Sequence, residues 1–315
     1  MPRSPRRPAA VVAVAIAASL GLVACGAGSG AGSTAGSGGS AAPAGTTTGG
    51  SAAASEDAAL AALVPDAVKA DGTITIGTDS TYAPSEFLDA DGKTVVGFDV
   101  DLFNAVAAKL GLKTEWVSAP FDNIIPSVTT SGKYDLGVSS FTVNAQRLKV
   151  ADMVSYFSAG SLWATAAGNP QKVAADDACG KKIAVQKGTI QADDVAARST
   201  KCTDAGKPAI TVDIYQGQDM VTSAVVTGKD DAMLADSPVV AYAVKQTGGK
   251  LALLGDVYDS APYGYVVKKG EGQFAQALVG ALKAVKADGT YQAVLAKWAV
   301  PQGAIDTFTV NPSVG

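Results

Sequence analysis

The sequence has no histidine among its 315 residues. This absence excludes Ser-His-Asp triads, Cys-His pairs and every metal site that needs imidazole. Only three cysteines are present, so a four-cysteine zinc site is excluded as well. We therefore expect no metal, no cofactor and no catalytic residue of these classes, whereas carboxylate chemistry stays open.

Charge is also scarce, because only 17% of the residues are charged and the net charge is −4. A basic tail or patch is lacking, so the sequence predicts no nucleic-acid partner. Hydrophobic residues make up 47% of the chain. At this length, that content is enough for two modest lobes with cores of their own.

The N-terminus has the pattern of an export signal. Three arginines lie within residues 1–8, and residues 9–24 are small and apolar. The segment ends Leu22-Val23-Ala24-Cys25-Gly26, which resembles a bacterial lipobox and predicts a lipid on Cys25 after cleavage of residues 1–24. An ordinary signal peptide and a retained membrane helix are the alternatives. The lipobox predicts an extracytoplasmic protein that is anchored to the cell membrane through Cys25.

Residues 25–55 consist almost entirely of glycine, serine, alanine and threonine. Such a composition cannot form a core and predicts a flexible tether between the lipidated cysteine and a folded body.

The folded body begins with alternating strand and helix signals. Apolar runs over residues 73–77, 114–117 and 134–138 predict strands, and the stretches after Gly97 and Phe121 predict helices. This alternation favours a mostly parallel sheet. Asp99 is expected to cap the start of the helix over 97–111, and Glu86 is interpreted as a structural acid that bonds nearby amides.

Residues 139–147 follow one of these strands and hold hydroxyls, a predicted helix N-cap at Asn144, and Arg147. Hydroxyls, helix-end amides and a guanidinium in one place suit a carboxylate or a phosphate. The alternative is a surface arginine after an ordinary turn.

Several motifs occur in a characteristic order. They are Asp79-Ser-Thr-Tyr-Ala-Pro-Ser-Glu-Phe87, Gly97-Phe-Asp-Val-Asp-Leu102, Ser131-Gly-Lys-Tyr-Asp-Leu136, the segment ending at Arg147, Ile183-Ala-Val-Gln-Lys-Gly-Thr189 and Asp231-Ala-Met-Leu-Ala-Asp236. With them, residues 60–300 resemble the family 3 extracellular solute-binding proteins of ABC importers, in the polar amino-acid-binding branch. The resemblance implies the type II periplasmic-binding-protein fold: two α/β lobes, each a mostly parallel sheet flanked by helices, joined by two hinge crossings.

The lobe boundaries follow from the resemblance together with breaker residues. Lobe 1 is expected over 56–167 and 262–315, and lobe 2 over 168–261. Residues 167–170 and 260–262 contain glycine or proline between strand-like runs, which favours connections at these points.

The resemblance also implies a ligand site for a free amino acid. Arg147 and Thr142 would hold the α-carboxylate, with a further donor from Thr189 of lobe 2. Asp236 of lobe 2 would take the α-ammonium, with help from Ser140.

The ligand side chain would lie between Tyr82 and Phe121 and point toward Asp79. A carboxylate there favours arginine or lysine, with glutamine or another polar amino acid next. Gln186 adds a neutral donor and acceptor. The alternatives are that Asp79 caps a turn and that both rings are ordinary core residues.

After lipidation of Cys25, two cysteines remain in an exported chain, which predicts a disulfide between Cys179 and Cys202; two buried thiols are the alternative. We expect a monomeric, non-enzymatic receptor that serves an ABC permease and ATPase. The alternatives are a cyclohexadienyl-dehydratase-like enzyme on the same fold and a sensing module for a separate membrane partner.

Overall fold

The structure is a computed structural model that describes residues 56–314. Its helices are α1 (Ala58–Ala61), α2 (Asp66–Lys69), α3 (Phe98–Lys109), α4 (Phe121–Thr129), α5 (Ala145–Val150), α6 (Ile190–Asp204), α7 (Gln218–Val226), α8 (Ser237–Gln246), α9 (Gly272–Ala287) and α10 (Thr290–Lys297). Its strands are β1 (Thr73–Thr78), β2 (Thr81–Tyr82), β3 (Glu86–Leu88), β4 (Val95–Val96), β5 (Lys113–Ser118), β6 (Leu136–Gly137), β7 (Ala151–Ala166), β8 (Lys182–Gln186), β9 (Thr211–Tyr215), β10 (Ala232–Asp236) and β11 (Leu251–Lys268). The predicted signal, tether and lipidation site at Cys25 lie outside the described residues.

One sheet runs in the order β5-β1-β6-β11-β7-β10-β8-β9. Strands β5, β1 and β6 are parallel, as are β10, β8 and β9, and the long strands β7 and β11 join the two groups as an antiparallel pair. We call the half with β5, β1 and β6 the first lobe and the half with β10, β8 and β9 the second lobe. The predicted α/β architecture is confirmed.

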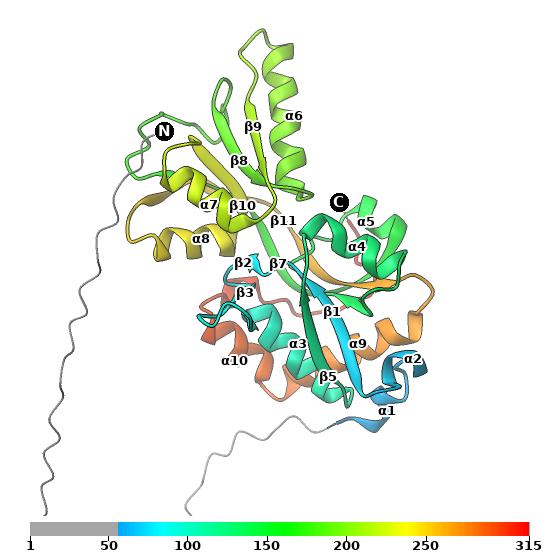
Figure 1. Ribbon diagram of the computed structural model, residues 1–315. Coiled ribbons are helices and arrows are strands. Elements are labelled where there is room, and N and C mark those ends of the chain that lie inside the picture. Colours follow the sequence, from blue (N-terminus) through cyan, green and yellow to red (C-terminus); the bar gives the residue numbers. More distant parts are fainter. Residues whose placement is uncertain (1–55, 315) are drawn as a thin grey trace, which may run out of the picture. The chain divides into compact units, whose positions relative to one another are not determined.

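Helices flank the strands in both lobes, with α3, α4, α9 and α10 in the first and α6, α7 and α8 in the second (Figure 1). The main core of the first lobe packs Phe98 and Leu102 of α3 with Phe274 of α9. The second lobe has one cluster around Val240 of α8 and another around Val195 of α6. Each lobe therefore has a core of its own.

The start of α3 differs from the expectation. Its N-cap is Gly97, which has φ 143° and no room for a Cβ, since that atom would lie 2.0 Å from the Ser85 carbonyl oxygen. Asp99 does not cap the helix. Its side chain is completely buried and bonds the loop after β6 instead, because burial in the first turn of α3 leaves it facing that loop.

Strands β7 and β11 pass through both lobes. Val154 pairs with Tyr265 in the first lobe, and Ala164 pairs with Leu253 in the second. Trp163 already packs in a core cluster of the second lobe, so the first crossing lies near Gly160. This position precedes the expected boundary at 167/168. The breaker residues there end β7 inside the second lobe instead of connecting the lobes.

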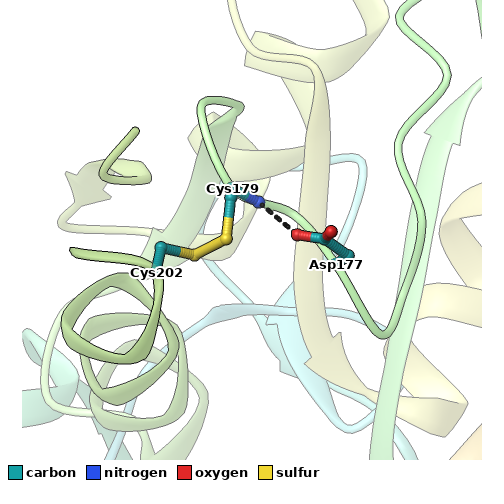
Figure 2. Close-up of side chains that lie close together, drawn as sticks. All are labelled: Asp177, Cys179 and Cys202. Atoms are coloured by element: carbon teal, nitrogen blue, oxygen red, sulfur yellow. Dashed lines mark hydrogen bonds between the residues drawn. A yellow bond between two sulfur atoms is a disulfide. The ribbon is translucent and has the colours of Figure 1, made fainter. Parts of the chain in front are cut away.

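A disulfide joins Cys179 and Cys202, whose Cα atoms are 5.6 Å apart (Figure 2). It links the loop before β8 to the last turns of α6. Asp177 lies beside it and accepts a hydrogen bond from the Cys179 amide at 3.3 Å. Although these three side chains lie within metal-ligand reach of one another, sulfurs in a disulfide are not thiolate ligands.

None of the helices between residues 56 and 314 combines the length and the apolar character that a membrane crossing requires.

Candidate ligand-binding site

The first lobe contributes the loop after β6. Asn144 caps α5 as predicted, with its Oδ1 accepting from the Arg147 amide at 2.9 Å. The Arg147 guanidinium donates to the Thr142 carbonyl oxygen at 2.8 Å and lies 5.4 Å from the centre of the Phe121 ring. Burial lowers the pKa of Arg147 to about 10, and the Asp236 carboxylate opposes this shift. The cation is thus held in place and partly desolvated.

The second lobe contributes the ends of two parallel strands. After β8, Thr189 caps α6 by accepting from the Ala192 amide at 3.2 Å. At the end of β10, Asp236 occupies the N-cap position of α8, but its side chain makes no capping bond to that helix. Its carboxylate instead accepts from the Tyr82 hydroxyl and from Gln191 Nε2, each at 2.8 Å. Burial raises the pKa of Asp236, and the bonds with Tyr82 and Gln191 oppose the rise.

These residues converge on one small cavity between the lobes. Its lining is Tyr82, Phe121, Ser140, Thr142, Arg147, Thr189, Ile190, Gln191 and Asp236. All the ligand residues predicted from the sequence are among them except Asp79. The cavity volume is about 10 Å³, and one water needs roughly 10–15 Å³. An amino acid can therefore enter only if the lobes separate.

Asp79 lies beside this cavity rather than in its wall. Its Oδ1 accepts from the Thr81 amide at 3.0 Å, which is the turn-capping geometry. Its Oδ2 accepts from the Phe121 amide at 3.0 Å and from Gln186 Nε2 of the second lobe at 2.8 Å. Burial raises the pKa of Asp79, and the bonds with Thr81 and Phe121 oppose the rise. Both carboxylate oxygens are therefore engaged.

Further contacts hold the lobes together around the cavity. Arg147 also donates to the Gly188 carbonyl oxygen at 3.2 Å, and the Gln218 amide donates to Thr81 Oγ1 at 3.0 Å. Gly188 has φ 79°, and a Cβ there would lie 2.9 Å from the Asp122 Cβ. The second lobe thus meets the first with no space for a larger residue at this point.

Comparisons with known proteins show the family of this chain. Residues 74–301 match the sequence profile of the bacterial extracellular solute-binding proteins, family 3. The chain belongs to this family. The arginine-binding protein ArgT of Corynebacterium glutamicum is 34% identical over 80% of this chain and 82% of its own length. The lysine/arginine/ornithine-binding periplasmic protein of Escherichia coli is 32% identical over 72% and 87%.

A solved structure, described as an ancestral arginine-binding protein bound to arginine, is 34% identical and has a TM-score of 0.66. It covers 72% of this chain and 98% of the solved one. These relatives are named for binding solutes and not for catalysis. The non-enzymatic character expected from the sequence is therefore confirmed, and the resemblance to the polar amino-acid-binding branch is confirmed with it.

The carboxyl groups of this solute-binding protein also fit an enzyme poorly. A dehydratase needs a general acid that reaches its substrate. Glu86 has no exposed surface, and its Oε1 accepts from the Ser139 hydroxyl at 3.0 Å. Glu86 is therefore structural, as expected. Its partner is the Ser139 hydroxyl and not a backbone amide, because β3 places the Glu86 side chain next to that of Ser139.

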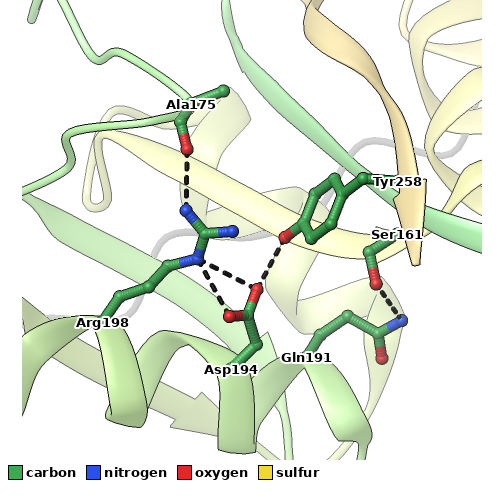
Figure 3. A network of polar contacts seen from close by, with 6 residues as sticks. All are labelled: Ser161, Ala175, Gln191, Asp194, Arg198 and Tyr258. Carbon is green, nitrogen blue, oxygen red and sulfur yellow. Dashed lines mark hydrogen bonds and ion pairs between the residues drawn. The ribbon is translucent and has the colours of Figure 1, made fainter. Parts of the chain in front are cut away.

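No sequence pattern predicted Gln191 at the site, since a glutamine in the first turn of a helix is usually exposed. Gln191 is buried where α6 packs against β8 and β10, and its Nε2 donates to Ser161 Oγ at 3.0 Å as well as to Asp236. On the same helix Asp194 accepts from Arg198 Nε at 2.9 Å and from the Tyr258 hydroxyl at 2.7 Å (Figure 3). Ser161 and Tyr258 pair across β7 and β11, so α6 contacts both strands near the crossings.

Proposed function

We propose that this solute-binding protein is the extracytoplasmic receptor for a basic amino acid, arginine before lysine. One observation carries the proposal: Arg147 of the first lobe and Asp236 of the second line the same buried cavity. A free amino acid presents a carboxylate and an ammonium a few bonds apart. It can therefore neutralise both side chains at once.

In this proposal the α-carboxylate binds Arg147 and the Thr142 hydroxyl, and Thr189 donates from the second lobe. The α-ammonium binds Asp236, and Ser140 supports it from the first lobe. Both ends of the ligand then contact both lobes. Only such differential contact shifts an equilibrium between open and closed lobes toward the closed one.

The ligand side chain passes between Tyr82 and Phe121 toward Asp79. In the closed protein, Gln186 Nε2 donates to Asp79 Oδ2 and, at 3.2 Å, to the Gln216 carbonyl oxygen. A guanidinium can replace this planar NH₂ group and reach the same two acceptors. An ammonium can replace it with less directional bonds. This substitution supports arginine as the first choice, and the names of the relatives point to the same ligand.

A thermal-shift screen against the free amino acids tests the proposal. A true ligand at about 100 times its Kd stabilises the protein by roughly 2.7 kcal/mol. We expect the largest shift from L-arginine, a smaller one from L-lysine and none from agmatine, which is arginine without its carboxylate. Stabilisation by agmatine equal to that by arginine would contradict the role of Arg147. A larger shift with glutamate would contradict the role of Asp79.

Delivery to an ABC permease and ATPase is the second part of the proposal. It is supported by the family, whose description is extracellular solute binding. Deletion of the gene is expected to abolish uptake of labelled arginine by intact cells. If uptake is unchanged and only an arginine-dependent transcriptional response is lost, the sensing alternative replaces it.

The lipid anchor on Cys25 is the third part, and it is supported by the lipobox pattern after a short apolar run. The variant Cys25→Ser is expected to lose the lipid mass and the membrane fraction. Unchanged mass and membrane partition in this variant would refute the anchor.

A further inference from the structure

Two acidic side chains meet beneath the loop that carries Ser140. Glu86 lies on β3 and Asp99 in the first turn of α3, and neither has any exposed surface. The two carboxyl groups accept hydrogen bonds from adjacent residues, Glu86 from Ser139 and Asp99 from Ser140, and each acts on the pKa of the other. No part of the proposed ligand chemistry uses this pair, so its arrangement needs its own explanation.

The hydrogen bonds of the pair are complete except at two atoms. Asp99 Oδ2 accepts from the Ser140 amide at 3.0 Å, from the Ser140 hydroxyl at 3.2 Å and from the Tyr156 hydroxyl at 2.6 Å. Glu86 Oε1 accepts from Ser139. Among the described residues, Glu86 Oε2 and Asp99 Oδ1 have no donor.

Two ionised carboxylates cannot satisfy each other, because each is only an acceptor. Leaving both charged without solvent would add mutual repulsion to the cost of burial. One proton placed between Glu86 Oε2 and Asp99 Oδ1 removes one charge and supplies the missing donor. A carboxylic acid that bonds a carboxylate therefore accounts for all four oxygens.

The surroundings of the pair favour keeping this proton. The titratable groups that act on it are Asp79 after β1, Tyr82 on β2, Tyr156 on β7 and Tyr265 on β11, and each of them is acidic. Burial raises the pKa of Glu86 well above its ordinary value, with Asp99 adding to the rise. Burial also raises the pKa of Asp99, to about 6.

The pair is connected to the ligand site through two serines. Ser140 has φ 50°, a left-handed conformation that is uncommon for a residue other than glycine. Asp99 holds both its amide and its hydroxyl in that conformation. Ser139 Oγ, which donates to Glu86, also accepts from the Asp79 amide at 2.9 Å. A change in the pair would therefore reach the backbone at both Ser140 and Asp79.

We propose that Glu86 and Asp99 share a single proton and that the protonated pair is the positioning element that fixes residues 139–140 for ligand binding. The proposal of a shared proton does not depend on the proposed function, whereas its effect on binding rests on that function. Glu86 and Asp99 are positioning residues, since neither reaches the cavity.

The pH dependence of stability follows from the direction of the shifts. A group whose pKa is higher in the folded than in the unfolded protein stabilises fully below the unfolded value, 4.5 for a glutamate. This contribution is lost as the pH rises through the folded value. Wild-type stability is thus expected to fall progressively above pH 4.5 because of this pair.

The experiment compares Glu86→Gln with Glu115→Gln, the same substitution at an exposed position of β5. In Glu86→Gln an amide hydrogen takes the place of the shared proton. We expect the infrared carbonyl band of a protonated carboxylic acid in the wild type at pH 7 and in Glu115→Gln, but not in Glu86→Gln. Denaturant unfolding between pH 5 and 9 is expected to depend less on pH in Glu86→Gln than in the other two proteins.

Calorimetry with arginine is expected to give Glu86→Gln an affinity within about threefold of the wild type, since its hydrogen bonds are kept. Glu86→Ala, which leaves the Ser139 hydroxyl without its acceptor and Asp99 Oδ1 without the shared proton, is expected to bind at least about tenfold more weakly. Asp99→Asn gives a second amide replacement, in which Glu86 becomes the ionised partner.

The absence of a protonated-acid band in the wild type would overturn the proposal, as would equal pH dependence of unfolding in wild type and Glu86→Gln. Failure of both Glu86→Gln and Asp99→Asn to fold would overturn it too, because an amide hydrogen should replace the proton. The infrared and unfolding measurements need no ligand. If the wild type binds no amino acid, the proposed function fails while the proton pair is still tested.

Discussion

The two lobes bring opposite charges to the cavity and hold them in different ways. In the first lobe Arg147 follows an irregular loop and is held by the Thr142 carbonyl and two phenylalanine rings. In the second lobe Asp236 is the last residue of the parallel strand β10 and the N-cap of α8. The position of Arg147 depends on the conformation of the loop after β6, whereas the position of Asp236 is set by regular strand and helix geometry.

The charged form of each of these two residues is favoured by the oppositely charged residue of the other lobe. Burial lowers the pKa of Arg147 and raises that of Asp236, so it disfavours the charged form of each, and each charge opposes the shift of the other. Contact between the lobes is therefore what brings the two charges close enough to offset each other's burial. The changes below alter one lobe at a time, from the largest expected effect to the smallest.

Arg147→Ala removes the charge of the first lobe. Binding of arginine is expected to weaken by about 2–5 kcal/mol or more, because a ligand carboxylate would be buried without its cation. Calorimetry measures this loss, and circular dichroism checks that the fold is kept. Lys149→Ala, on the exposed side of the same helix, is the matched control with unchanged affinity. A loss under tenfold in Arg147→Ala would count against its role.

Reduction of the Cys179–Cys202 disulfide affects the second lobe alone. The free energy of unfolding is expected to fall by about 3 kcal/mol in the chain-entropy model. Arginine affinity is expected to stay unchanged, since the bond lies away from the cavity. Denaturant unfolding with and without reductant measures the effect, and a non-reduced digest shows the linked peptides by mass spectrometry. Two alkylatable thiols in freshly exported protein would disprove the bond.

Asp79→Asn keeps Arg147 and Asp236, which are proposed to bind the α-carboxylate and the α-ammonium. It removes only the charge proposed to select the ligand side chain. The ratio of arginine to glutamate affinity is expected to fall at least about tenfold, or about 1.4 kcal/mol. Competition calorimetry at pH 7 measures this ratio. An unchanged preference for cationic over acidic ligands would show that Asp79 does not select the side chain.

Lys187→Ala breaks the interlobe ion pair with Asp122, whose atoms are 2.8 Å apart. The lysine side chain is 54% exposed, so we expect a loss of at most about 1 kcal/mol in ligand affinity. That loss should shrink further at high salt because solvent ions screen exposed charges. An effect as large as that of Arg147→Ala would mean that the rim, and not the buried cavity, controls closure.

Local patterns predicted the parts of the fold and site that depend on neighbouring residues. The Asn144 cap, the strand before residue 139 and the hydroxyls and Arg147 after it follow from composition and spacing, whereas the strand before residue 187 and the roles of Thr189 and Asp236 come from the family resemblance. The predicted capping role of Asp99 is wrong because its actual partner, Ser140, lies 41 residues away in the sequence. No pattern marks Gln191 as buried, or Gly160 as the crossing, because packing between distant segments decides both.

The antiparallel pairing of β7 and β11 determines how the lobes can move. Both crossings are neighbouring strands of one hydrogen-bonded ladder, and the ladder is irregular between Tyr258 and Ala261. Bending the ladder there changes the angle between the lobes and keeps the bonds, whereas rotation of one lobe about the strand direction would shear them. We therefore expect relative movement of the lobes to occur mainly as a bend at this point. A single distance between two labels, one on each lobe, is enough to report how far the protein has closed.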